Sequence, residues 1–182
     1  MTEEGVTLYR GLREVYIDRT TSSFINGKEG KLYYRGYSID DLAQNCGFEE
    51  ISYLVMMGEL PTSSQLESFS KELKSNMGLP KEIIDLIEIV KDAHPMDVLR
   101  TAISALAGFD SEVDDNSSEA TLRKGTKLTA QAPTIVAAHA RIRQGLDPIT
   151  PDPKLSIAAN FLYMLFGTVP DPEDAKLIDK DF

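Results

Sequence analysis

The chain has 182 residues, of which 42% are hydrophobic and 26% charged, and its formal net charge is −10. This length and composition predict one soluble, well-packed domain and exclude a disordered chain. The acidic balance argues against a nucleic-acid partner, because binding to a phosphate backbone needs a basic surface. No apolar run approaches the roughly 18 residues of a membrane span, and the single Cys46 cannot form an internal disulfide. We therefore expect no membrane partner and a cytoplasmic location.

A β-hairpin is expected at about residues 22–35. This part of the chain is rich in β-branched and aromatic residues, and its Asn26-Gly27 dipeptide is typical of a two-residue hairpin turn. We predict strands near Ser22–Ile25 and Lys31–Tyr34.

The remainder of the chain, from residue 38 onward, has the periodicity of helices, so the predicted fold class is all-α with a small β-hairpin. Side chains that cap a helix, or a proline in its first turn, mark the expected helix starts at Ser38, Thr62, Pro80, His94 with Pro95, and Asp171 with Pro172. A long helical pattern over 119–144 contains Pro133, which should kink the helix or split it in two. A buried helix is expected over 155–166, with Phe166 on its apolar face.

The run from His94 to Phe109, HPMDVLRTAISALAGF, is the most unusual helix of the chain. Its only charge between Leu99 and Phe109 is Arg100. A surface helix normally keeps one charged face, so this helix should be covered on most sides. The cover could be the rest of the fold, a second copy of the chain, or a part that is not present here.

The sequence contains few candidates for catalysis. His94 and His139 lie 45 residues apart and do not form a metal-binding spacing, so each is interpreted as structural. Cys46 stands at a helix end without a nucleophile motif, and the glycines of residues 27–31 are too closely spaced for a phosphate-binding loop. We therefore predict no catalytic, substrate-binding or metal-binding residue in this chain.

Two charged clusters have an alternative, functional interpretation. Basic residues that could form a small anion pocket are interpreted instead as a solvated helix face: Arg123, Lys124 and Lys127. The acidic run Asp110–Glu119 resembles a calcium loop only superficially. An EF-hand requires glycine at its sixth position and glutamate at its twelfth, where this chain has Asp115 and Thr121. A solvated loop is the expected structure.

Five consecutive segments together resemble the citrate synthase family. In chain order they are FINGKEGKLYYRGYSIDDLA, FEEISYLVMMGELPT, AHPMDVLRTAISALAGFD, KLTAQAPTIVAAHARIRQG and LSIAANFLYMLFGTVPDPEDAKLID. They stand in the family's order and spacing and cover the chain from about Gly11 to its end. The prokaryotic short form of the family is the most similar, and the 2-methylcitrate synthases share these segments.

The resemblance implies that residues 1–182 form the N-terminal part of the large helical domain of a citrate synthase. The family condenses acetyl-CoA with oxaloacetate, uses a coenzyme A thioester as substrate, and has no tightly bound cofactor. Its catalytic histidines and aspartate and its carboxylate-binding arginines lie beyond the position that matches Phe182, as does its small domain. None is carried over, so the chain alone is expected to be inactive. Acetyl-CoA and propionyl-CoA both remain possible donors.

The resemblance also implies a homodimer formed through the helices at about 95–108 and 134–144. Small residues are expected to let these helices approach their copies closely: Ala102, Ala105, Gly108, Ala137 and Ala138. Two alternatives remain, namely one subunit of a split citrate synthase and a non-catalytic helical module for dimerisation or interaction. The last helix, at 177–182, has no stop signal, which favours a portion of an enzyme over a self-standing module.

Overall fold

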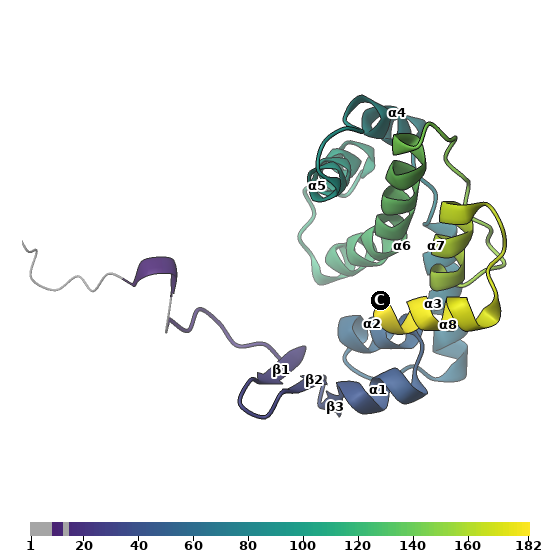
Figure 1. The fold of residues 1–182 in the computed structure, drawn as a ribbon. Coiled ribbons are helices and arrows are strands. Elements are labelled where there is room, and N and C mark those ends of the chain that lie inside the picture. Colours follow the sequence, from purple (N-terminus) through teal and green to yellow (C-terminus); the bar gives the residue numbers. More distant parts are fainter. Residues whose placement is uncertain (1–8, 13–14) are drawn as a thin grey trace, which may run out of the picture.

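The computed structural model describes residues 9–12 and 15–182. Within these residues the chain forms a three-stranded sheet, eight α-helices and two short 3-10 helices (Figure 1). This confirms the predicted all-α class with a small β element near the N-terminus. The helices are α1 (Ile39–Asn45), α2 (Phe48–Met57), α3 (Ser63–Ser75), α4 (Lys81–Ile89), α5 (Pro95–Leu106), α6 (Ser118–Arg143), α7 (Ile157–Phe166) and α8 (Pro172–Asp181).

The sheet consists of β1 (Ser23–Asn26), β2 (Lys31–Tyr34) and β3 (Tyr37–Ser38), all antiparallel to their neighbours. The predicted strands are confirmed, but the predicted two-residue turn is wrong. Asn26 pairs with Lys31, so the connection has four residues. Gly30 adopts the left-handed conformation (φ 66°) that closes this longer loop. The short β3 was not predicted, because two residues show no periodicity.

Most predicted helix starts are confirmed by side-chain caps. Ser38, Thr62, His94 and Asp171 each accept a hydrogen bond from a backbone amide in the first turn of the helix that follows. Such a cap satisfies an amide that has no partner within the helix. These helix starts are therefore set by hydrogen bonds between residues only two or three positions apart in the sequence.

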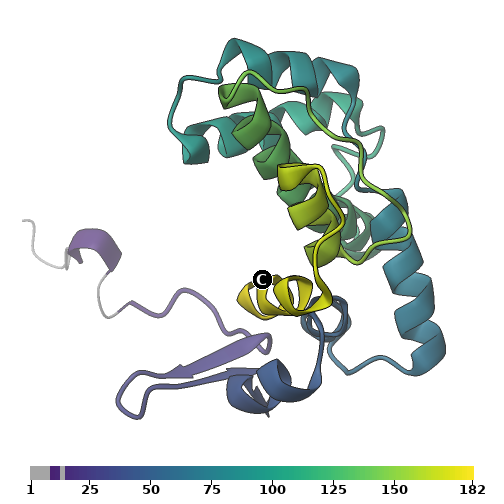
Figure 2. The same ribbon diagram turned by 45° about the vertical axis from the view of Figure 1, so that its right-hand side comes forward.

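Two clusters of buried side chains meet on α6, which passes between α5 and α7 (Figure 1; Figure 2 gives a second view). The first cluster joins α6 to α4 and α5: Ile83, Ile87, Val98, Ala102, Leu106, Ile135, Ala138 and Ile142. The second joins α6 to α3 and α7: Phe69, Leu73, Met77, Ala130, Ala137, Ile157 and Met164. The longest helix thus forms the central support of the fold.

Of the two outcomes expected at Pro133, the split does not occur, because α6 runs as one helix from Ser118 to Arg143. Its ribbon bends along its length (Figure 1). An interior proline costs about 3 kcal/mol. Fully burying one large apolar side chain contributes about 1.5–3 kcal/mol, and α6 carries buried residues on both sides of the proline, including Ala130 and Ile135. Tertiary packing therefore outweighs the local cost.

One predicted core residue is on the surface. The Phe166 side chain is 72% exposed, although the rest of α7 is largely covered. Phe166 is the last residue of the helix, and Gly167 follows in the left-handed conformation (φ 81°) that ends it. The predicted end of the helix at residue 166 is confirmed, but the periodic pattern did not show that its last side chain lies outside the core.

Candidate functional site

Both histidines have structural partners. The Nδ1 atom of His94 accepts a hydrogen bond from the Met96 amide at 3.2 Å and so caps α5. His139 is 5% exposed, and its Nε2 atom lies 2.9 Å from the Lys91 carbonyl oxygen, to which Nε2–H donates. This bond ties the C-terminal part of α6 to the segment between α4 and α5. These positions agree with the structural interpretation of the two residues.

Cys46 is poorly suited to act as a nucleophile. Partial burial raises the pKa of its thiol, the nearby Glu50 carboxylate raises it further, and Lys180 opposes them. A raised pKa reduces the fraction of thiolate, which is the reactive form. The backbone carbonyl of Cys46 accepts a hydrogen bond from Lys180 Nζ at 2.6 Å. Cys46 therefore helps to hold the end of α1 against α8.

The basic cluster holds a loop against α6. Arg123 forms a bidentate pair with Glu112, and Lys124 Nζ donates to the carbonyl oxygens of Glu112, Val113 and Asp115 at 3.2, 3.3 and 2.5 Å. Two of the three cations thus already have partners within the chain. An anion pocket is not supported, but the predicted solvated face understates their role, because they fix the acidic loop in place.

The acidic loop does not assemble a metal site. Among residues 9–12 and 15–182, no group of three or more His, Cys, Asp or Glu side chains is arranged to hold a metal ion. The Asp110 and Asp115 carboxylates accept backbone hydrogen bonds from Glu112 and Ser117, at 2.9 and 2.8 Å. Backbone hydrogen bonding lowers the pKa of Asp115, so this carboxylate stabilises the loop conformation.

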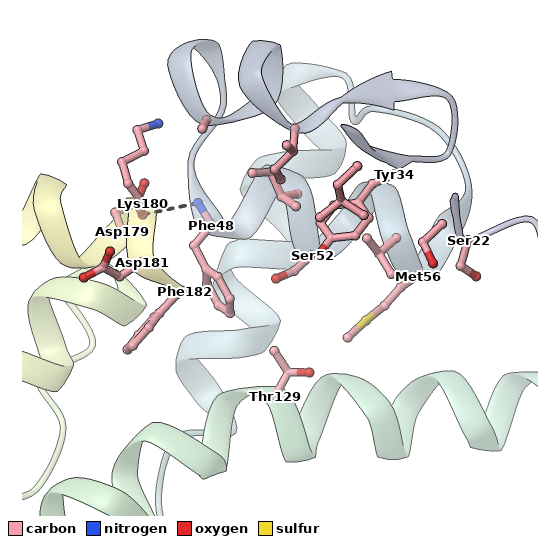
Figure 3. Close-up of a pocket in the computed structure, with 16 residues that line it drawn as sticks. Ser22, Tyr34, Phe48, Ser52, Met56, Thr129, Asp179, Lys180, Asp181 and Phe182 are labelled. Atoms are coloured by element: carbon pink, nitrogen blue, oxygen red, sulfur yellow. Dashed lines mark hydrogen bonds between the residues drawn. The ribbon is translucent and has the colours of Figure 1, made fainter. Parts of the chain in front are cut away.

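One concave feature is a mainly apolar hollow with a volume of about 580 Å³, which we call the hairpin groove. It lies between the sheet, α2, α6 and the C-terminal end of α8. Figure 3 shows Tyr34 and Met56 on one side of the open space and Thr129 on the other. Its main apolar lining consists of Leu32, Tyr34, Ile51, Val55, Met56 and Phe182.

The end of α8 closes one side of the hairpin groove. Asp179 accepts a hydrogen bond from the amide of Phe48, the first residue of α2, at 3.2 Å (Figure 3). The ring of Phe182 lies 5.4 Å from that of Phe48 and 5.3 Å from that of Phe161, measured between centroids. These contacts fix α8 against α2 and α7. Sequence reasoning missed this arrangement, because its members are far apart along the chain.

A second exposed feature is the outer surface of α5 and α6, which we call the helix surface. Its side chains are mostly small, and it includes the exposed ion pair of Asp97 with Arg100 on α5. On α6, residues spaced by four positions are at least partly exposed: Ala132, Val136 and Ala140. The exposed residues of α5 include Met96, Asp97, Arg100, Thr101 and Ser104, and the exposed Ala107 and Gly108 follow in a 3-10 helix. One side of α5 is therefore covered by the chain and the other is open.

Part of the predicted dimer contact is wrong in detail. Ala102, Ala137 and Ala138 are between 0% and 4% exposed, because they pack inside the two core clusters of the chain itself. Helical periodicity could not tell which of the small residues face inward, since both faces are rich in alanine. Ala105 and Gly108 stay at least partly exposed.

In the part of the chain that the structure describes, none of the helices has the length and apolar character needed to cross a membrane.

Comparisons with a family model, with protein sequences and with solved structures all point to the same family. A family model described as citrate synthase, C-terminal domain, matches residues 11–182. The chain is 43% identical to 2-methylcitrate synthase 2 of Corynebacterium glutamicum, over 95% of this chain and 46% of that protein. It is 42% identical to citrate synthase 2 of Bacillus subtilis, over 96% of this chain and 47% of that protein. The crystal structure of citrate synthase from Pyrobaculum aerophilum has a similar fold, with a TM-score of 0.91 and 37% identity, over 96% of this chain and 46% of that chain.

The chain thus spans about half the length of the relatives it matches, which fits the expected N-terminal half. Both the sequence similarity and the structural similarity to these relatives extend over almost all of this chain. The match also includes both citrate and 2-methylcitrate synthases. This chain belongs to the citrate synthase family.

Proposed function

We propose that this chain is the N-terminal part of the large helical domain of an enzyme that condenses an acyl-CoA with oxaloacetate. One observation carries the proposal: the similarity covers 95% of this chain but only 46% of a 2-methylcitrate synthase. The simplest role is therefore a portion of the same enzyme, working together with the remainder of the family fold. The lone Cys46 is in keeping with a reducing compartment such as the cytoplasm.

The reaction needs groups that this chain does not supply. A base removes a proton from the α-carbon of the acyl thioester, and the enolate attacks the ketone carbon of oxaloacetate. Water then cleaves the thioester and releases CoA. Such a step requires a positioned base and a donor to the developing enolate oxygen. Both histidines of this chain are held by backbone partners instead. We infer that the chain alone is a scaffold without activity.

A thiol-release assay tests this inference. The purified 182-residue chain is incubated with oxaloacetate and either acetyl-CoA or propionyl-CoA, and free CoA is measured against a control without oxaloacetate. No oxaloacetate-dependent release is expected with either donor. Release above the control would show that the chain contains a complete active site and would overturn the inference.

We also propose that the helix surface mediates a homodimer through residues 95–108 and 134–144. Support comes from its small and apolar side chains, since apolar burial stabilises an interface and a two-fold axis brings the same patch together twice. Val136 is 40% exposed on this surface without a covering element. A helix that carries such a face is normally partnered.

Light scattering at several protein concentrations tests the dimer. We expect twice the monomer mass for the unaltered chain and monomers for Val136→Glu, because each copy would bury a carboxylate. Ile89→Glu is the matched control, since Ile89 is 80% exposed on α4 and lies outside the proposed contact. A well-folded monomer of the unaltered chain at high concentration would contradict the proposal.

A further inference from the structure

We propose that Asn26 is a site of spontaneous chemical modification, at which the side-chain amide is converted to aspartate and isoaspartate while the chain stays folded. The Asn26-Gly27 dipeptide predicted a two-residue turn, which the structure does not form. The dipeptide instead opens the four-residue connection between β1 and β2. Water is the only co-reactant, and the inference is independent of the proposed function.

The reaction at Asn26 has two steps. The backbone nitrogen of Gly27 loses its proton to solvent and attacks Cγ of Asn26. A C–N bond forms, the bond from Cγ to the side-chain nitrogen breaks, and that nitrogen takes up a proton and leaves as ammonia. Water then opens the five-membered imide ring. Opening at Cγ leaves aspartate at position 26, and opening at the backbone carbonyl carbon leaves isoaspartate.

The Gly27 nitrogen is accessible for this attack. In the part of the chain that the structure describes, its N–H donates no hydrogen bond, because the ladder of β1 and β2 ends with the pair Asn26 and Lys31. Gly27 is exposed, and a methyl group added to its Cα would meet no atom within 4 Å beyond its chain neighbours. Solvent therefore reaches the amide proton, and no side chain of its own shields it.

The Asn26 side chain is directed towards the same peptide. The Glu29 amide donates to the backbone oxygen of Asn26 at 3.2 Å, which forms a β-turn, and to its side-chain Oδ1 at 3.3 Å. The carboxamide is therefore folded back over the residues that follow it, where the Gly27 nitrogen lies. A donor to Oδ1 also stabilises the negative charge that develops on this oxygen during the attack.

Asn116 provides a comparison within the same chain. It is an exposed residue of the acidic loop, and Ser117 follows it. The Ser117 amide donates to the Asp115 carboxylate at 2.8 Å. This bond holds the proton that must leave, and the nearby negative charge disfavours an anionic nitrogen. The fold therefore protects Asn116 and leaves Asn26 reactive.

The products change the end of the hairpin. Each adds one negative charge to a chain whose formal net charge is already −10. Isoaspartate also inserts a carbon atom into the backbone at the last residue of β1, where Asn26 faces Lys31. Because strand pairing depends on register, this insertion weakens the last pair of the ladder.

The test gives both loops the same dipeptide. In Ser117→Gly, Asn26 and Asn116 both precede glycine, and glycine is well tolerated at a helix N-cap, so α6 should still form. The folded variant and the same variant in urea are incubated at mildly alkaline pH, and peptide mass spectrometry measures conversion at each asparagine. In the folded variant we expect Asn26 to convert about tenfold faster than Asn116, which reacts only after local opening. In urea the two rates should be similar.

Gly27→Ala is the second variant. Gly27 lies outside the left-handed region that favours glycine, and the added methyl group has space, so the fold should persist. The methyl group shields the amide, and we expect conversion at Asn26 to slow by about tenfold. Transfer of a labelled methyl group from S-adenosylmethionine by an isoaspartyl methyltransferase identifies the isoaspartate.

Circular dichroism checks that each variant is folded. Equal conversion of Asn26 and Asn116 in folded Ser117→Gly would overturn the proposal, as would unchanged conversion of Asn26 in Gly27→Ala. An Asn26 side chain that stays intact in the folded, unaltered chain but converts in urea would also overturn it, since the fold would then protect the site.

Discussion

The carboxylate of Glu49 accepts a hydrogen bond from the backbone amide of Ile157 at 3.0 Å, across 108 residues of chain. Glu49 lies in the first turn of α2, and Ile157 is the first residue of α7. The amide end of α2 in turn receives the carboxylate of Asp179 from α8. Each carboxylate meets the positive end of a helix dipole, where a negative charge is stabilising. Three helices are thus linked through charged caps.

Replacing Glu49 should therefore weaken the contact between α2 and α7. We expect Glu49→Ala to lower the free energy of unfolding by about 1–2 kcal/mol, because a charge-assisted hydrogen bond to a helix end is lost. Urea denaturation followed by circular dichroism measures the change. Glu82→Ala is the control: Glu82 also lies in a first helical turn but is exposed, so its loss should cost less than about 0.5 kcal/mol. Equal costs would show that the contact contributes nothing.

Asn160 organises the proline-rich loop that precedes α7. Its side chain is fully buried, accepts from the Asp152 amide at 2.8 Å and donates to the Asp152 carbonyl at 2.6 Å. Asn160→Ala leaves both backbone groups without this partner, and we expect a loss of about 2–3 kcal/mol in urea unfolding. Asn45→Ala removes a single exposed hydrogen bond to Asp41 and should cost less than about 0.5 kcal/mol. A neutral Asn160→Ala variant would contradict this role.

Local features of the fold could be predicted from the sequence. The caps at Ser38, Thr62 and Asp171 act over two or three residues, so the residue types alone reveal them. The hairpin turn was predicted wrongly because Gly27 and Gly30 both supply turn flexibility, and only the register of the strands selects the second. Sequence patterns therefore locate helix boundaries better than the details of loops.

Non-local features could not be predicted. Glu49 and Asp179 are ordinary surface acids by pattern, and only the packing of α2 against α7 and α8 gives each an amide to cap. The hairpin groove combines residues from Ser22 to Phe182, which no window of the sequence joins. The helices expected to form the dimer contact were identified through the family, while burial alone revealed that Ala137 faces inward.

Pro133 shows where tertiary packing overrides a local preference. The proline has no amide hydrogen to donate inside α6, yet the helix continues on both sides of it. We expect Pro133→Ala to raise the free energy of unfolding by about 1–3 kcal/mol, because it restores one helical hydrogen bond. Pro172→Ala at the first position of α8 should be nearly neutral, since that amide has no helical partner. Loss of stability in Pro133→Ala would show that the ring itself is required.

Cys46 should react slowly with thiol reagents. Burial raises the pKa of its thiol above the usual value, which is about 8.5 for free cysteine. At pH 8 the folded chain therefore contains less thiolate, and we expect slower reaction with a chromogenic disulfide than for the chain in urea. The folded state holds its proton longer than the unfolded state, so stability should fall as the pH rises from about 8.5 towards the higher folded pKa. The variant Cys46→Ser should lose this dependence, and a faster reaction when folded would contradict the account.

The proposed function treats this chain as a portion of a citrate synthase-type enzyme that needs the remainder of the family fold for activity. Oxaloacetate-dependent thiol release by a fusion of this chain with the unmatched part of Bacillus subtilis citrate synthase 2 tests this most directly. The account predicts release with acetyl-CoA or propionyl-CoA by the fusion protein, and none by the 182-residue chain at equal concentration. A fusion protein that folds cooperatively but releases no thiol with either donor would contradict the proposed function.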